Sequence, residues 1–333
     1  MRELDPADLS RRVATVMADT EVADCEPLAG GASSLTYSAT VTTNGDRRAI
    51  VVKVAPPGLE PVRNRDVLRQ ARILDALWKI DGVAVPEVLA TDPGDPPDVP
   101  PLFVMSRVEG DSIEPLITPD LPVPPETVRD RAMAAARMMA ALHAVDVGGV
   151  GLGDEPVTGL QDEVARWERA FSTVDDELRV GADELQARLV RRIPAEARPM
   201  VLHGDYRLGN MLCDGPEVAA LIDWEIWSVG DPRLDLAWFL LMADRDHPGV
   251  VSSDAGMPST DTLLDVYEGF TGLAVDDLAW FAALARYKQA ATTALIVKNA
   301  RKRGHGDALP GTFVALQAEL NAWALRLLDA QPL

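Results

Sequence analysis

The pattern of apolar residues changes near residue 105, and this change is the feature that most limits the fold. Before it, short alternating or apolar runs are separated by turn residues, as is typical of strands. From residue 126 onward, apolar residues recur at helical spacing in long Ala- and Leu-rich stretches, at 126–144, 160–193, 259–270, 276–300 and 312–330. The sequence therefore predicts a bilobal α+β protein, with a small β-rich N-lobe over 1–105, a hinge over 106–111 and a larger helical C-lobe over 112–333.

Local signals predict the elements of the N-lobe. Asp5 and Pro6 are suited to the N-cap and first turn of a helix over 5–19. The step Asn44-Gly45 separates two β-prone runs and is the strongest short signal for a hairpin. Further elements are expected as a helix over 63–80 and strands over 83–89 and 102–108. Together they predict a small, mostly antiparallel sheet with one or two helices.

The charge balance limits the classes of partner. The 333 residues include 32 Lys or Arg and 52 Asp or Glu, so the formal net charge is −20. Proteins that bind nucleic acid neutralise phosphates with a basic face, which makes nucleic acid an unexpected partner here.

The sequence shows neither the pattern of a signal peptide nor that of a membrane span. The N-terminal segment is charged from its second residue and lacks the apolar core of a signal peptide. The apolar runs 236–243 and 290–297 are much shorter than the roughly 18 to 20 residues that span a bilayer. The two cysteines, Cys25 and Cys213, do not suggest a disulfide framework, which fits a reducing compartment. We therefore expect a soluble, cytoplasmic protein with no membrane partner.

One segment of the C-lobe carries an unusual set of polar residues. Residues 203–210 read HGDYRLGN, and Asp223 follows thirteen residues after Asn210, at the end of an apolar, strand-like run. Asp205, Asn210 and Asp223 could thus meet at one edge, and such oxygen ligands suit Mg²⁺ better than zinc. The alternative is that these residues are ordinary turn formers and helix caps.

HGDYRLGN, together with IDWE over 222–225, resembles the catalytic loop and metal-binding segment of the aminoglycoside phosphotransferase family. This family has a protein-kinase-like fold and includes choline kinase-like enzymes, and the resemblance extends from Gly30 to about Phe239. It implies that Asp205 is the catalytic base for the acceptor hydroxyl, and that Asn210 and Asp223 hold Mg²⁺ on the phosphates of ATP. It also implies that the aspartates of the following segment GDPRLDL, Asp231 and Asp235, brace the catalytic loop.

Lys53 supports the same interpretation by a separate route. The chain has five lysines, yet this one lies in the apolar run 50–54. A buried ammonium is costly without an anion, so a lysine in a buried strand usually meets one. Similar kinases use this lysine on the α- and β-phosphates of ATP. The alternative is an edge-strand lysine whose amino group reaches water.

The resemblance also assigns the remaining nucleotide contacts. Gly30, Gly31 and Ser33 would form the turn over the phosphates, where missing side chains let backbone amides approach. The backbone of Ser106 and Val108 would pair with adenine, and Met105 would lie at the back of the adenine pocket. The alternatives are an ordinary hairpin turn and a core methionine.

Two positions depart from the family pattern. The family commonly places a glutamate on the N-lobe helix to pair with the strand lysine, and the matching residue here is Gln70, which brings no charge. Asp66, one turn earlier, could substitute, or nucleotide could orient Lys53. Arg207 lies two residues after Asp205, where many protein kinases carry a lysine. We hypothesise that it stabilises the transferred phosphoryl charge, and the alternative is that it braces the loop.

These residues predict an ATP- and Mg²⁺-dependent kinase that phosphorylates a hydroxyl group of a small molecule. One alternative is a nucleotide-binding pseudokinase, suggested by Gln70. The other is a metal-dependent hydrolase, for which few imidazole ligands are available, built on His203, Asp205, Asp223 and Glu225. The motif wording is closest to kinase-like domains found with acyl-CoA dehydrogenases, so the acceptor could be a hydroxyacyl-CoA as well as an aminoglycoside, a sugar or an amino alcohol. The basic cluster around Arg301 could anchor an acyl-CoA, but it also has the pattern of a charged helix end before Gly304. His143 is expected to be structural, at the end of a helix.

Overall fold

A computed structural model describes residues 4–18, 20–28, 34–252, 254–304 and 312–330. The chain forms two compact units, and each is assembled from separate segments. The first unit comprises Met1–Ser112, Val147–Asp154 and Asn210–Trp227, and the second comprises Ile113–Asp146, Glu155–Gly209 and Ser228–Leu333. The α+β class predicted from the sequence is confirmed. The assignment of lobes to 1–105 and 112–333 with a hinge at 106–111 stays a prediction.

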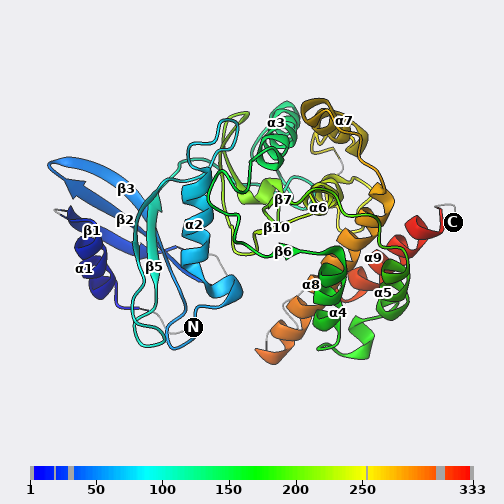
Figure 1. Ribbon diagram of the computed structural model, residues 1–333, viewed down its shortest axis with the longest axis horizontal. Helices are drawn as coiled ribbons and strands as arrows, with labels where there is room; N and C mark the ends of the chain where they lie inside the picture. Colours follow the sequence, from blue (N-terminus) through cyan, green and yellow to red (C-terminus); the bar gives the residue numbers. More distant parts are fainter. Residues whose placement is uncertain (1–3, 19, 29–33, 253, 305–311, 331–333) are drawn as a thin grey trace. The chain divides into compact units, whose positions relative to one another are not determined.

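The first unit is built around a five-stranded antiparallel sheet with the strand order β1-β2-β3-β5-β4 (Figure 1). The strands are β1 (Thr20–Pro27), β2 (Leu35–Thr43), β3 (Asp46–Val54), β4 (Val88–Asp92) and β5 (Leu102–Ser106). The predicted hairpin is confirmed, because Thr43 pairs with Asp46 and leaves Asn44 and Gly45 as a two-residue loop. Both loop residues have positive φ, 54° and 90°, which is the conformation that favours Asn-Gly in such turns.

The alternation of side chains gives the two faces of this sheet different tasks. One face is apolar and packs with Leu9 and Val13 of helix α1 (Pro6–Val16), whose first turn is capped by Asp5 as predicted. The opposite face carries the residues one position along each strand, among them Lys53 and Phe103, which are directly paired in the register of β3 and β5. Helix α2 (Val67–Leu77) borders this second face (Figure 1) and buries Gln70 and Leu74.

Three details of the first unit differ from the prediction. Strand β1 was not expected, because its polar residues and its edge position leave most of it exposed. The strand expected at 83–89 begins only at Val88, since Pro86 has no N–H to give to a ladder. The helix expected at 63–80 is divided into a short 3₁₀ turn, Arg63–Arg65, and α2.

A hairpin from the middle of the chain completes the first unit. Strands β8 (Met211–Asp214) and β9 (Glu217–Leu221) pair antiparallel. Asp111 and Cys213 exchange both backbone hydrogen bonds, at 3.0 and 2.9 Å, and so tie the segment after β5 to this hairpin. Gly110 has φ of 148°, and a Cβ there would lie 2.9 Å from the backbone of Cys213, so the close approach requires glycine.

The second unit is mainly helical. Its helices are α3 (Pro125–His143), α4 (Leu160–Phe171), α5 (Ala182–Arg191), α6 (Arg233–Ala243), α7 (Thr260–Thr271), α8 (Leu278–Lys302) and α9 (Thr312–Asp329). A small sheet of order β6-β10-β7 (Val157–Thr158, Ser228–Gly230 and Met200–Leu202) accompanies them. The core is formed by apolar residues of α4, α5, α6, α8 and α9. Among the residues described, no helix is both long and apolar enough for a membrane span.

The single helix expected over 160–193 is divided in the structure. Helix α4 ends at Phe171, a 3₁₀ turn covers Asp176–Leu178, and α5 begins at Ala182. Thr173 and Val174 are β-branched and disfavour helix, and Gly181 adopts a left-handed φ of 76° just before α5. The helices expected at 126–144, 259–270, 276–300 and 312–330 are each present within three residues of the predicted ends.

Candidate active site

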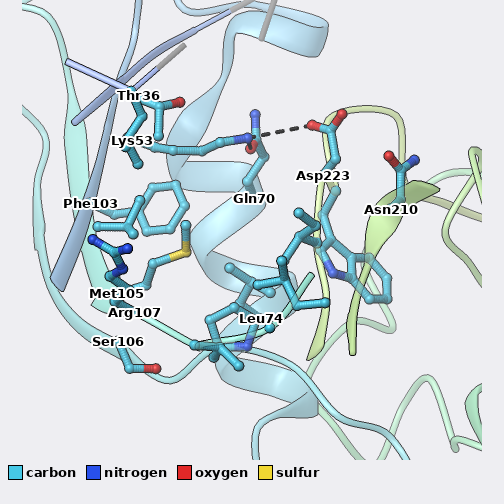
Figure 2. Close-up of a pocket in the computed structure, with 18 of the residues that line it drawn as sticks. Thr36, Lys53, Gln70, Leu74, Phe103, Met105, Ser106, Arg107, Asn210 and Asp223 are labelled. Atoms are coloured by element: carbon cyan, nitrogen blue, oxygen red, sulfur yellow. Dashed lines mark hydrogen bonds and ion pairs between the residues drawn. The ribbon is translucent and has the colours of Figure 1, made fainter. Parts of the chain in front are cut away.

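A cavity of about 380 Å³ lies in the first unit against the α2 side of the sheet (Figure 2). Its walls come from β3 and β5 through Val51, Lys53, Phe103 and Met105, and from α2 through Gln70 and Leu74. Ser106 and Val108 also line it, so the structure brings the residues expected to meet adenine to the same cavity as Lys53. The predicted phosphate turn, Gly30, Gly31 and Ser33, lies outside the described residues. Leu28 and Thr36, on either side of that turn, line the cavity.

The backbone at the end of β5 alternates in direction. The Arg107 N–H donates to the Ala49 carbonyl of β3, at 3.2 Å. The Ser106 N–H points to the other side and donates to the carbonyl of Glu87, at 2.8 Å.

Lys53 lies among three oxygen atoms from two segments of the chain. Its Nζ donates to Gln70 Oε1 at 3.2 Å and lies 3.5 Å from Asp223 Oδ1 (Figure 2). It also lies 4.0 Å from Oε1 of Glu225. The Lys53 side chain is only 11% exposed, so it is a buried cation with anionic partners, and not an edge-strand lysine directed into water.

Asn210 and Asp223 are brought together by the β8–β9 hairpin. Asn210 directly precedes β8, and Asp223 follows β9 by two residues, so the antiparallel pairing places both at the same end of the hairpin. The Ile222 N–H donates to the Asn210 carbonyl at 2.9 Å, which extends this pairing. Asp223 has a φ of 68°, a left-handed conformation that aspartate tolerates better than most residues.

The donor set at this end of the hairpin fits Mg²⁺. Asn210 supplies an amide oxygen and Asp223 a carboxylate, both on the wall of the cavity. Mg²⁺ prefers few protein oxygen ligands and keeps positions for water and phosphate. Within the residues that the structure describes, no group of three His, Cys, Asp or Glu could hold a metal on protein ligands alone.

The loop that carries Asp205 belongs to the second unit and is fixed through its backbone. Asp235, in the first turn of α6, accepts hydrogen bonds from the N–H groups of His203 and Gly204, at 2.6 and 2.8 Å. The expectation that Asp235 braces the loop is confirmed. Asp231 is different, because it accepts from Ala197 N and from Arg233.

The carboxylate of Asp205 is held from two sides. The indole Nε1 of Trp238 donates to Asp205 Oδ1 at 2.8 Å. The Nε of Arg207 lies 3.3 Å from both carboxylate oxygens, and its Nη1 donates to Glu114 Oε2 at 2.8 Å. Arg207 is thus paired with two carboxylates, one of them the predicted base. A Cβ at Gly209 would lie 2.7 Å from Glu114 Oε2, so this glycine permits the close packing of Glu114 on the loop.

Lys288 of α8 adds a second cation beside the loop. Its Nζ donates to the carbonyl of Gly204 and lies 4.0 Å from the ring centroid of Trp238. Burial lowers the pKa of Lys288, because desolvation disfavours the ammonium, although Asp205 opposes this shift. Trp238 therefore contacts the predicted base with its N–H and Lys288 with its ring face.

Burial and charge also shift the pKa values of two carboxyl groups near the loop. Burial raises the pKa of Glu114, and Arg207 counteracts part of this increase. Burial alone would raise the pKa of Asp235. Its contacts with His143 and His203 outweigh this effect and hold the pKa below its ordinary value. His143 is buried, as expected for a structural residue, with Nδ1 2.9 Å from the Tyr267 hydroxyl.

The contacts bear on two alternatives left open by the sequence. Asp66 does not substitute for a helix glutamate, since its carboxylate caps α2 by accepting from Arg69 N at 3.0 Å. The basic cluster around Arg301 is the end of α8, with Gly304 at φ of 73°, and Arg301 pairs with Asp175 and Glu177. His305, four residues after Arg301, lies outside the described residues.

Four residues of the site were missed by the sequence reasoning. Trp238 stands three residues after Asp235, so both lie on one helix face, and that spacing was a usable signal. Lys288 is one of five lysines and interrupts an apolar helix, a second usable signal. Glu225 was noted only as a hydrolase residue. Glu114 had no local signal, because its contact with Arg207 spans 93 residues.

Comparison with known proteins identifies the chain. A model of the phosphotransferase enzyme family matches residues 24–267. The chain belongs to this family. The predicted recognition and the predicted enzyme class, a phosphotransferase, are confirmed.

Solved structures and a curated relative extend this result. A candidate aminoglycoside phosphotransferase from Ralstonia eutropha superposes with a TM-score of 0.78 at 21% identity, covering 99% of this chain and 100% of that one. A thermostable mutant of an aminoglycoside phosphotransferase, in ternary complex with ADP and hygromycin B, gives 0.62 at 15% identity, covering 98% and 100%. Acyl-CoA dehydrogenase family member 11 of Rattus norvegicus is 25% identical over 73% of this chain. The alignment covers 33% of that relative, so the phosphotransferase corresponds to about a third of its length.

Replacing Asp235 with Asn should destabilise the phosphotransferase. Each loop N–H donates to a different carboxylate oxygen, and in Asn one of these oxygens is replaced by an NH2 donor, so one N–H loses its acceptor at a cost of about 1 to 3 kcal/mol of unfolding free energy. Because the folded pKa lies below the unfolded value of 3.8, the contribution of Asp235 is present above that pH and is lost as pH falls through the folded pKa. Thermal unfolding of Asp235→Asn should show a large deficit at pH 7 that narrows below about pH 4. The exposed Asp254→Asn is the control. If Asp235→Asn lowered the unfolding temperature by the same amount at pH 7 and below about pH 4, the charged role of Asp235 would be contradicted.

Replacing Trp238 with Phe should lower kcat with little effect on nucleotide binding, and it should also lower the unfolding temperature because the indole is buried. The ring remains, but Asp205 loses a hydrogen bond of the charged type, worth about 1.5 to 3 kcal/mol, so kcat should fall at least about 10-fold. Trp280→Phe is the matched control, because it removes an indole hydrogen bond to the Leu189 carbonyl in the core. That control should lower the unfolding temperature and leave kcat near the wild-type value. A Trp238→Phe protein with wild-type turnover would show that the indole does not position the base.

Proposed function

We propose that the phosphotransferase moves the γ-phosphate of ATP to a hydroxyl group of a small molecule, with Asp205 as the base. The observation that carries the proposal is the convergence of Lys53, Asn210 and Asp223 on one cavity. A strand lysine, an amide oxygen and a carboxylate at one wall provide the cationic and metal-binding groups that a nucleoside triphosphate needs.

The nucleotide would occupy the cavity of the first unit. Its volume of about 380 Å³ is in the range of small-ligand sites, and its apolar walls include Leu74, Phe103 and Met105. Adenine would lie among these side chains and pair with the backbone of Ser106 and Val108. Lys53 would hold the phosphates, and Gly30, Gly31 and Ser33 would provide backbone amides above them. The ADP-bound structural neighbour supports an adenine nucleotide as substrate.

Asn210 and Asp223 would hold Mg²⁺ together with the phosphate oxygens. When bound, the ion supplies positive charge that offsets the charge of the phosphates during transfer. The chain's own part is to present two oxygen ligands from the same end of a rigid hairpin, beside the Lys53 ammonium.

Asp205 would orient the acceptor hydroxyl and accept its proton. The Trp238 indole donates to Oδ1 of Asp205 and so fixes the orientation of the carboxylate. The remaining lone pairs of Asp205 would then point in a fixed direction toward the acceptor hydroxyl. Arg207 would stabilise charge on the transferred group, and its pairing with Glu114 and Asp205 holds the guanidinium beside the base. Productive transfer requires this group and the nucleotide of the first unit to meet the same hydroxyl.

Replacing Asp205 with Asn should abolish transfer and leave ATP binding unchanged, because the base does not belong to the nucleotide cavity. Asp223→Asn should weaken binding of ATP in the presence of Mg²⁺ by about 10-fold or more, since it removes a charged ligand. Coupled ADP release and calorimetric binding measure the two effects, with Asp214→Asn at the exposed hairpin end as control. Retained turnover by Asp205→Asn would refute the assignment of the base. Nucleotide binding without turnover by the wild type on every acceptor class would favour the pseudokinase.

The acceptor should be neutral or anionic next to its reacting hydroxyl. Lys288 places an ammonium on the Gly204 carbonyl, directly before the base, so an acceptor ammonium there would meet like charge. A hydroxyacyl thioester avoids this repulsion, whereas a polycationic aminoglycoside does not. ADP release in a screen of hydroxyacyl-CoA esters, sugars, amino alcohols and aminoglycosides should be highest with the first class, with Asp205→Asn as blank. Higher kcat/KM for hygromycin B or another aminoglycoside would contradict this choice.

A further inference from the structure

The anionic partners of the Lys53 ammonium do not come from helix α2. Helix α2 offers it the neutral oxygen of Gln70, and the nearby Asp66 is committed to capping that helix. Its two anionic partners, Asp223 and Glu225, both come from the segment that follows β9.

The exposed fractions of Lys53, Asp223 and Glu225 indicate different roles for the two carboxylates. Asp223 is 40% exposed and stands beside Asn210, which suits a ligand for an ion that arrives with substrate. Lys53 and Glu225 are 11% and 15% exposed, so both are largely withdrawn from water. A buried ammonium needs a full opposite charge close to it, and an amide oxygen supplies only a dipole.

We propose that Glu225 is a positioning residue that holds the Lys53 ammonium toward the nucleotide phosphates and supplies the negative charge that Gln70 lacks. The 4.0 Å between Lys53 Nζ and Glu225 Oε1 is at the outer limit for an ion pair and is an electrostatic contact, not a hydrogen bond. Gln70 completes the arrangement with a shorter, neutral hydrogen bond at 3.2 Å, which fixes the lysine's direction without carrying charge.

This arrangement links the phosphate lysine to the metal-binding segment. Asp223 and Glu225 are two residues apart, and the left-handed φ of 68° at Asp223 turns the chain so that both reach the same ammonium. A change at Glu225 therefore alters the position of Lys53 without removing a group from the nucleotide or the metal. The Lys53 role in this inference rests on the proposed function, but the ion pair itself does not.

The first experiment tests the ion pair in the protein without nucleotide. A double-mutant cycle compares the urea unfolding midpoints of the wild type, Lys53→Met, Glu225→Gln and the double variant. With a real pair, the double variant unfolds at nearly the same urea concentration as the single variants. Additive shifts would overturn the pairing, and this result does not depend on whether the protein binds ATP.

The second experiment tests the positioning role by moving the charge. Binding of ADP without Mg²⁺, measured by calorimetry, should weaken about 10-fold in Glu225→Gln, as for loss of a charge-assisted contact. Gln70→Glu combined with Glu225→Gln should restore affinity to within about 3-fold of wild type, because it returns a carboxylate to Lys53 from α2. The exposed Glu217→Gln in the same hairpin should bind ADP as the wild type does.

Each outcome of the second experiment is decisive. Wild-type affinity in Glu225→Gln, or a loss that Gln70→Glu does not restore, would overturn the positioning role. If Glu225→Gln fails to fold, the combined variant decides, since a folded and ADP-binding double variant supports charge replacement and an unfolded one contradicts it. Absence of ADP binding by the wild type itself would refute the proposed function and leave the urea cycle as the measure of the pair.

Discussion

The first unit depends on the burial of one ammonium group in the middle of a sheet. Lys53 lies on β3, between β2 and β5, and its side chain is 11% exposed. An isolated charge in that place would cost several kcal/mol, so the fold must bring oxygen atoms to it. They come from α2 and from the segment after β9, two parts of the chain more than 150 residues apart. Neutralising this charge therefore joins the sheet, the helix and the hairpin around one cavity.

The second unit buries a negative charge, the carboxylate of Asp235, beside the loop that carries Asp205. Asp235 is 1% exposed, and it offers its two oxygens to the backbone N–H groups that open the Asp205 loop. Trp238 and Arg207 then fix the Asp205 side chain itself. Backbone and side chain are thus restrained by separate contacts, and both sets include residues of α6. For Asp205 in its proposed role as base, such restraint would mean that little freedom is lost when an acceptor binds.

Much of this arrangement was predictable from local sequence. The Asn44-Gly45 hairpin and the Asp5 cap depend on neighbouring residues only, and the long helices show their period over many turns. Asn210 and Asp223 could be brought together because they flank a short hairpin. The errors arose where a wider context decides: the exposed edge strand β1, the proline at 86, and the break between α4 and α5.

The side-chain contacts of the site were less predictable for a physical reason. The pairs Lys53–Glu225, Arg207–Glu114 and Lys288–Gly204 each span more than 80 residues, and no periodicity encodes such partners. Gln70 could be recognised as a departure from the family, but not what compensated for it. The compensating charge depends on the turn at Asp223, whose left-handed φ no local pattern announced.

The motif HGDYRLGN contains residues of both units. The division between them falls inside the motif, because Gly209 belongs to the second unit and Asn210 to the first. The segment of Asp205 is therefore held by Asp235 and Trp238, while Asn210, five residues later, is held by the hairpin. Glu114 holds the intervening turn through the N–H of Gly209, at 3.2 Å, and a side chain at 209 would clash with it. The backbone between Asp205 and Asn210 is therefore restrained by a contact made within the second unit.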